Sequence, residues 1–275
     1  MKPWQKTVRY CAIAFAIIIM VNIVFWGLSL VGLMFGVASP GTSDEATVYS
    51  FNADGIENLE IDISAARFTF DTSNGDKIIV KSNIKKLTAK EDGKTVKVKE
   101  KQRAWAVADS DAYIDVTVPL DFVFKKVEIF GGAGMISING LNSEKLDLDL
   151  GAGDTSIDRL KITKKADIDG GAGNLTFTRT EITELDLDLG VGYFNFHGVL
   201  NGNNDISFGV GESVFDFYDD KERYYFDVEK GIGEIEYYGP EDFNFVRDGQ
   251  DTTVKLEGGI GKITIRFFDK IDNEG

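Results

Sequence analysis

Paired aspartates recur through the middle of this 275-residue chain, and each pair encloses one leucine or isoleucine just before a Gly-x-Gly sequence. Three pairs are nearly identical: Asp147 and Asp149, Asp167 and Asp169, and Asp186 and Asp188. Such residues could serve three kinds of chemistry. Two carboxylates can hydrolyse a glycosidic bond, carboxylate clusters bind Ca²⁺, and glycine-rich loops can cradle a phosphate.

Phosphate binding is not expected at these glycines. A dinucleotide loop needs the full GxGxxG sequence between a strand and a helix. Here the pattern after each Gly-x-Gly is that of a second strand, and no window completes the sequence.

Calcium binding stays open as a role for the aspartates. Residues 170–178, GGAGNLTFT, resemble the calcium β-roll repeat, but Leu175 stands at the aspartate position and the period is about 20 rather than 9 residues. The six aspartates could still stack outward as weak candidates for a calcium site. The alternative is a solvated acidic face, partly offset by Lys126, Lys145 and Lys165. No other cofactor is expected.

Repetition argues against catalysis. Asp147 and Asp149 formally meet the requirement for two carboxylates. A catalytic pair is placed once in a cleft, whereas these pairs recur without a singular neighbour. We expect no catalytic residues, and a polysaccharide-active enzyme is the less favoured alternative.

Composition excludes further classes. Lys and Arg number 30 against 45 Asp and Glu, a net charge of -15, so a nucleic acid is not expected as partner. The single cysteine, Cys11, excludes an intrachain disulfide and a thiolate metal cluster. The single histidine, His197, excludes most zinc sites and His-based triads, and it should point outward because it follows an inward Phe196.

The glycines belong to a repeat. Seven Gly-x-Gly sequences start at steps of 19, 20, 19, 19, 22 and 28 residues. The residue three positions before the first glycine of each Gly-x-Gly is always apolar. The residue six positions after that glycine is always large and either apolar or aromatic. Acidic residues alternate with the apolar ones, which is typical of strands with one buried face. A degenerate copy, with Ser64 and Ala66 in place of glycines, lies at 59–71.

Two short strands in about 20 residues predict one coil of a solenoid. The expected fold is therefore all-β, a single-stranded β-solenoid or β-helix of about 19–20 residues per coil, preceded by one N-terminal transmembrane helix. The glycines would turn its corners, because they reach positive φ without a Cβ clash. The residue between them is expected to point inward. The corner glycines are Gly132, Gly134, Gly151, Gly153, Gly171, Gly173, Gly190, Gly192, Gly209, Gly211, Gly231, Gly233, Gly259 and Gly261.

Two stretches depart from the repeat. Residues 72–125 contain the turn sequences SNGD and EDGK and predict an antiparallel flap or cap beside the first coil. Later inter-coil segments are rich in aromatic residues, which could either stack on sugars or pack the wide end of the core. These residues are Tyr218, Tyr224, Tyr225, Tyr237, Tyr238, Phe243 and Phe245.

The N-terminus predicts a membrane anchor. Residues 11–38 carry no charge, and as a helix they would extend about 42 Å, enough to cross roughly 30 Å of hydrocarbon with tilt. Basic residues in 1–10 place that end in the cytoplasm, and 50–275 then form an extracellular domain after a linker at 39–49. A cleaved signal peptide, ending near Ala38, is the alternative. Gly32 and Gly36 could join two spans into a homodimer, although small residues are common in any span.

The motifs GAG, GVG and GIG recur seven times in register after an apolar segment, and this pattern is similar to that of a known family. Residues about 50–268 resemble the bacterial "putative adhesin" β-solenoid domains, which are related to LiaG-like and toast-rack envelope proteins. The resemblance implies an outward-facing protein tethered to the cell membrane, with no established catalysis. It transfers no functional residues.

The expected function is that of a membrane-anchored, extracytoplasmic scaffold or interaction protein, adhesin-like or part of an envelope-stress system. Its partner would be a protein or glycan that the sequence does not identify. The alternatives are a calcium-dependent binding surface and the polysaccharide-active enzyme.

Overall fold

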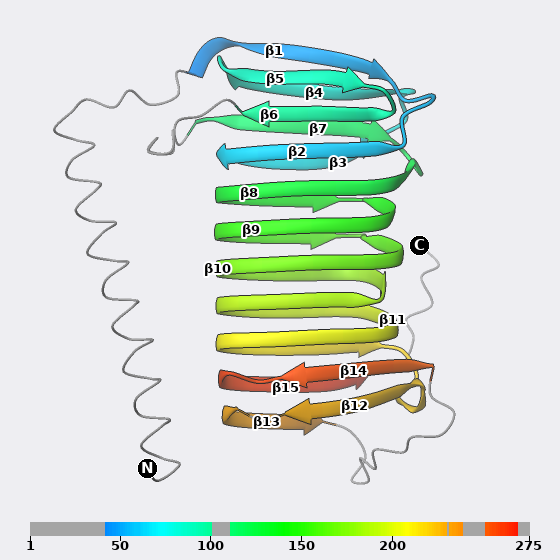
Figure 1. Cartoon of the computed structure of the whole chain (residues 1–275), viewed down its shortest axis with the longest axis vertical. Coiled ribbons are helices and arrows are strands. Elements are labelled where there is room, and N and C mark those ends of the chain that lie inside the picture. The colour runs from blue at the N-terminus through cyan, green and yellow to red at the C-terminus, as the bar shows by residue number, and fades with distance from the viewer. Residues whose placement is uncertain (1–41, 101–110, 230, 239–250, 269–275) are drawn as a thin grey trace, which may run out of the picture. The chain divides into compact units, whose positions relative to one another are not determined.

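The structure is a computed structural model that describes residues 42–100, 111–229, 231–238 and 251–268. These residues form fifteen strands and one short 3₁₀ turn, which confirms the all-β prediction. The strands join in one continuous sheet that winds as a flattened coil (Figure 1). In the described ranges no helix has the length and apolarity to cross a bilayer. The predicted span, residues 11–38, lies outside them.

Four long strands form the middle of the stack, and each turns back on itself at one edge, so that the coil has two layers (Figure 1). They are β8 (Val123–Asn139), β9 (Asn142–Asp158), β10 (Lys161–Thr183) and β11 (Leu185–Tyr218). Neighbours pair in parallel and in register, since Leu148 of β9 lies between Ile129 of β8 and Ile168 of β10. Each coil therefore repeats the hydrogen-bonding surface of the one before it.

The core lies between the two layers and is filled by the inward residues of each coil. The position six residues after the first glycine is Ile157 in one coil, then Phe177, Phe196 and Phe215 in the next three, all with no exposed surface. Phe177 and Phe196 lie 6.0 Å apart between ring centroids, and Phe196 and Phe215 lie 6.3 Å apart. Full burial of each such ring stabilises the fold by about 2 kcal/mol or more.

The Gly-x-Gly sequences lie at the edge where the long strands turn back. There the coils approach so closely that a Cβ on Gly153 would stand 1.9 Å from the carbonyl oxygen of Gly134, and one on Gly173 would stand 1.8 Å from that of Gly153. At φ +145° and +143°, both glycines also adopt backbone conformations that other residues rarely reach. All fourteen corner glycines would place a Cβ within 2.7 Å of a backbone oxygen of the neighbouring coil. We call this side of the stack the glycine edge.

The prediction that the residue between the glycines points inward is wrong. These residues are exposed, with Val191 at 47% and Ile232 at 51%. The missing Cβ atoms of the flanking glycines face the next coil along the stack, so the middle side chain can only project away from the core.

A second turn closes each coil at the opposite edge and uses single residues of positive φ. Gly140 has φ +79°, Arg159 +53° and Arg179 +52°. The two arginines reach back one coil, because Arg159 Nη2 donates to Asn139 Oδ1 at 2.6 Å and Arg179 Nε donates to Asp158 Oδ1 at 2.9 Å. These bonds offset part of the 1–2 kcal/mol that a left-handed residue costs.

The N-terminal end extends the stack before it closes. The first coil consists of β2 (Asn58–Ala65) and β3 (Arg67–Ser73), which pair in parallel with β8. On their other side, β6 (Thr95–Glu100) and β7 (Tyr113–Pro119) pair with them, again in parallel.

Antiparallel strands then finish that end, with β5 (Leu87–Asp92) on β6, β4 (Lys77–Ile84) on β7, and β1 (Thr42–Asn52) on β4. The region 72–125 is thus antiparallel only in part, and the rest of it continues the coil. Among the described strands, β1 and β5 are the outermost at this end.

The last two coils do not stack in chain order. After the 3₁₀ turn Lys221–Arg223, one coil is formed by β12 (Tyr224–Glu229) and β13 (Ile232–Tyr238). The final coil, β14 (Thr252–Glu257) and β15 (Ile260–Phe268), pairs with β11 on one side and with β12 and β13 on the other. The coil of β14 and β15 therefore lies between two coils that precede it in sequence.

We predict that Gly153→Ala lowers the free energy of unfolding by about 3 kcal/mol or more, because the new methyl group meets the backbone of the next coil. Gly93→Ala is the matched control, since Gly93 also has positive φ, +63°, but its Cβ would meet nothing within 4 Å. It should cost only about 1 kcal/mol. Chemical denaturation of the full chain in detergent measures both. Equal losses would show that the close approach of the coils is unimportant.

Candidate functional site

The six predicted aspartates form two rows on the outer face of the strands that lead to the glycine edge. Asp147, Asp167 and Asp186 pair with one another in register, and Glu128 extends their row. Asp149, Asp169 and Asp188 form the second row in the same way. The rows run along the stack, so the carboxylates of one row repeat at about the 4.8 Å spacing of neighbouring strands.

Lysines compensate the first row. Lys126 Nζ lies 2.7 Å from Glu128 and 2.6 Å from Asp147, and Lys165 Nζ lies 3.2 Å from both Asp167 and Asp186. Hydrogen bonds to these carboxylates raise the pKa of both lysines. Each lysine thus bridges two coils.

The second row has no such partner. No lysine, arginine or histidine of the described residues forms an ion pair with Asp149, Asp169 or Asp188. The pKa of Asp169 is raised, first by burial and then by repulsion from Asp149 and the neighbouring aspartates. The row is one wall of an open groove of about 480 Å³, which we call the acidic groove. The rest of the lining is formed by Leu150, Gly170, Gly171, Leu189, Gly190, Ser207, Phe208 and Gly209.

The aspartates do not converge. Over the described ranges, no group of three or more His, Cys, Asp and Glu side chains is arranged to hold a metal ion. The carboxylates repeat in rows, with no coil distinguished from the next. Calcium binding by these six residues stays a prediction.

The exposed residues between the corner glycines form an apolar row beside the acidic groove. In stack order they are Ala133, Ala152, Ala172, Val191, Val210, Ile260 and Ile232. The four largest are 41–51% exposed. We call this set the apex row. Its side chains grow toward the C-terminal end of the stack, so its exposed apolar surface grows in the same direction.

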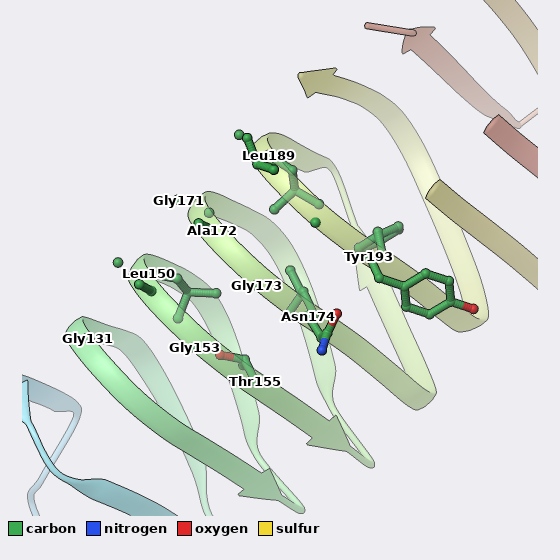
Figure 2. Close-up of a pocket in the computed structure, with 18 of the residues that line it drawn as sticks. Gly131, Leu150, Gly153, Thr155, Gly171, Ala172, Gly173, Asn174, Leu189 and Tyr193 are labelled. Atoms are coloured by element: carbon green, nitrogen blue, oxygen red, sulfur yellow. The ribbon is translucent and has the colours of Figure 1, made fainter. Parts of the chain in front are cut away.

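Beneath the glycine edge runs a narrow void, shown in Figure 2. Leu150, Thr155 and Leu189 are among the residues that line it, together with the corner backbone. Its volume is about 50 Å³, room for only a few water molecules and far below the several hundred Å³ of a typical ligand pocket. It is a packing seam.

In several coils, two residues that lie five positions apart in the sequence fill this seam together. Ile136 reaches the space above Gly131, where a Cβ would stand 2.6 Å from its Cδ1 atom. In the next coil the sizes are reversed, with a large Leu150 and a small Thr155. Phe208 with Ser213 and Gly258 with Ile263 also combine a large and a small residue, whereas the space above Gly170 is filled by Leu189 of the next coil, whose partner Phe194 is also large. The sequence signal for this relation is the five-residue spacing of Gly131 with Ile136 and of Leu150 with Thr155.

His197 lies on the outer face, as expected, in a cluster that ties three coils together. Its Nδ1 atom is 3.2 Å from Asp216, whose side chain is only 4% exposed. Arg266 of the final coil holds the same carboxylate through two nitrogen atoms, and this contact raises the pKa of Arg266. The cluster fastens the last coil in place.

The aromatic residues of the late segments divide between core and surface. Tyr224 is buried and its hydroxyl donates to the carbonyl of Leu200 at 3.2 Å, while Tyr237 is half-buried against the core. Tyr238 is 56% exposed. Tyr218 stacks at 5.4 Å on Phe268 of the final coil. Phe243 and Phe245 lie outside the described residues. The buried members pack the end of the core rather than forming a sugar platform.

In-register parallel coils, a glycine edge and antiparallel closing strands define the class as β-solenoid. Residues 56–252 match the Toastrack DUF4097 family, and the chain belongs to that family. This confirms the resemblance to the toast-rack proteins. No curated protein matches the chain.

Three solved structures show how distant its structural relatives are. A putative cell adhesion protein from Clostridium sporogenes is 13% identical, with 82% of this chain and 99% of that chain covered and a TM-score of 0.38. A putative adhesin from Bacteroides fragilis is 12% identical, with 83% and 99% covered and a TM-score of 0.42. A putative lipid binding protein from Parabacteroides distasonis is 12% identical, with 82% and 98% covered and a TM-score of 0.42. Likeness this distant says nothing about the ligand of this chain.

We predict that Leu150→Gly destabilises the protein by about 3 kcal/mol because it empties the seam of its coil. Adding Thr155→Leu should recover more than half of that loss, since the double variant copies the arrangement of Gly131 with Ile136. Thr155→Leu alone should cost about 1–3 kcal/mol by overpacking. Chemical denaturation measures all three. Additive losses in the double variant would contradict shared filling.

We predict that Asp169→Asn raises the melting temperature at neutral pH. The folded protein disfavours the charged form of Asp169, so its raised pKa is a penalty that is present above that pKa. The penalty disappears as the pH falls below the pKa of the unfolded chain, and the variant and the parent should then melt alike at about pH 3. Melting curves between these pH values check this. Asp76→Asn is the control, because Asp76 lies in an exposed turn and forms no ion pair with the described residues. It should not change the melting temperature, and a gain as large as that of Asp169→Asn would contradict the cause given.

Proposed function

We propose that this chain is a membrane-anchored, outward-facing binding scaffold without catalytic activity. One observation carries the binding role: the apex row exposes a continuous line of apolar side chains next to an acidic groove. Monomeric proteins rarely leave such surfaces uncovered unless they meet a partner. The regular coils supply a stiff support, since each one is hydrogen-bonded along both layers to its neighbours.

The absence of catalysis is supported by the arrangement of the carboxylates. Neighbouring coils present the same pair of aspartates in register, and among the described residues no group of three or more His, Cys, Asp and Glu side chains is arranged to hold a metal ion. A catalytic site differs from its surroundings, whereas each aspartate here has equivalents one coil away. An adhesin-like or envelope-stress role fits a surface of this kind.

The membrane anchor rests on the sequence. The uncharged segment 11–38 follows a basic N-terminus, so we place residues 1–10 in the cytoplasm and 50–275 outside the cell. A homodimer through Gly32 and Gly36 belongs to the same proposal. Protein or glycan partners would then be met on the outer side of the cell membrane.

Cysteine labelling in intact cells tests the orientation. In a Cys11→Ser background, Asn74→Cys in an exposed turn should react with a membrane-impermeant maleimide, whereas Lys6→Cys should react only after permeabilisation. Fractionation should recover the whole chain with the membrane. Labelling of Lys6→Cys in intact cells, or release of a shortened chain into the soluble fraction, would contradict the anchored arrangement.

A further inference from the structure

We propose that the glycine edge docks a cationic amphipathic helix of another protein, with the apolar side of the helix on the apex row and its Lys or Arg side chains in the acidic groove. This inference rests on the proposed binding role and names the chemistry of the partner.

The apex row supplies the apolar contact. Val191, Val210 and Ile260 follow one another in the stack and expose 47%, 41% and 41% of their surface. Nothing on the strands forces these positions to be apolar, because their side chains project away from the core. A polar residue would be equally compatible with the turn, so the apolar choice indicates burial against a partner.

The acidic groove supplies the charge. Asp149, Asp169 and Asp188 lie in register and form no ion pair with the described residues, although Lys126 and Lys165 compensate part of the charge of the row two residues upstream. Ser207 ends this row of aspartates, and Glu257, which follows it in the stack, is already held by Lys255, so the uncompensated charge lies at the three aspartates. Since mutual repulsion along such a row is unfavourable, a row of external cations is the complement that relieves it.

The glycines make close approach possible. Gly171, Gly190 and Gly209 line the groove and carry no side chain above its floor, while Leu150, Leu189 and Phe208 add apolar surface to it. A partner can thus lie against backbone on one side and contact the apex row on the other. The far flank of the row is also acidic at Asp154, Glu212 and Glu234, and its one cation, Lys262, is held by Glu236 at 2.8 Å.

The spacing of the coils selects a helix. Side chains of one row repeat about every 4.8 Å, the distance between neighbouring strands. A helix advances about 5.4 Å per turn, so one residue per turn stays within about 2 Å of successive coils over three steps. An extended peptide presents side chains of one face about every 6.6–6.8 Å, so its side chains no longer match the spacing of the coils after the first step.

Charge argues against other occupants. A second copy would bring its own acidic rows and a net charge of -15 to the same edge. Anionic lipid and nucleic acid are repelled in the same way. A cationic polypeptide is the class of partner that meets the apolar row and the acidic groove together.

The test uses the full chain in nanodiscs of zwitterionic lipid and a fluorescent Leu/Lys helix of about five turns, roughly 18 residues, with leucine along one face. Fluorescence anisotropy at several salt concentrations gives the affinity. Asp149→Asn/Asp169→Asn/Asp188→Asn should weaken binding about tenfold or more and flatten its salt dependence. Val191→Ser/Val210→Ser should weaken binding without changing the salt dependence. Melting curves establish that each variant is folded.

The control Asp54→Asn/Asp76→Asn/Glu91→Gln removes the same charge from exposed positions of the N-terminal cap and should change the affinity less than about twofold. A loss equal to that of the groove variant would reveal general charge attraction and overturn the proposal. So would equal binding of a scrambled peptide that cannot form an apolar face, or of empty nanodiscs. Concentration-dependent self-association that the valine variant abolishes would assign the row to a second copy instead. None of these outcomes affects the orientation seen by cysteine labelling, which tests the proposed function separately.

Discussion

At the glycine edge, the backbones of neighbouring coils touch with no side chain between them, and the rest of the stack depends on this contact. A Cβ on Gly192 would stand 1.7 Å from the carbonyl oxygen of Gly173, so a coil can settle on its neighbour only where its own corner residues are glycine. The first coil, with Ser64 and Ala66, is met by Gly132 and Gly134 of the second. That contact fixes the register of the strands on both sides of the turn. It also leaves the residue between the glycines no direction except outward, which creates the apex row from a steric requirement alone.

Register in turn decides the electrostatics. Once Asp147 and Asp149 occupy fixed places in one coil, their equivalents in the next coils must line up behind them. The first row is stabilised because Lys126 and Lys165 each span a pair of coils. The second row gains no such contact from the described residues, and burial, followed by repulsion from the neighbouring aspartates, raises the pKa of Asp169. The same register thus produces one row of carboxylates that is stabilised by ion pairs and one that is not. The difference between the two rows depends on Lys126 and Lys165.

The sequence predicted what period and alternation encode: the strands, the repeat of about 20 residues, the buried position filled by Ile157 or Phe177, and the family. It could not show the direction of Val191, because alternation along a strand does not extend through a tight turn. The turns at the opposite edge could not be predicted from glycines, since Arg159 and Arg179 reach positive φ without being glycine. The seam relation of Leu150 with Thr155 needs the two layers in space. The position of the final coil between β11 and the coil of β12 and β13 departs from chain order, and periodicity carries no information about such an order.

The insertion of the last strands between earlier ones has a consequence for biogenesis. The coil of β12 and β13 leaves the ribosome, and crosses any membrane, before the segment on which it must rest. Until the C-terminal residues arrive, it has no neighbour with which to pair in the native order, and it must either wait or form a provisional contact with β11. Assembly at this end is therefore finished only by the arrival of the final residues, so a prematurely terminated chain would present an unfinished surface that quality-control proteases can recognise.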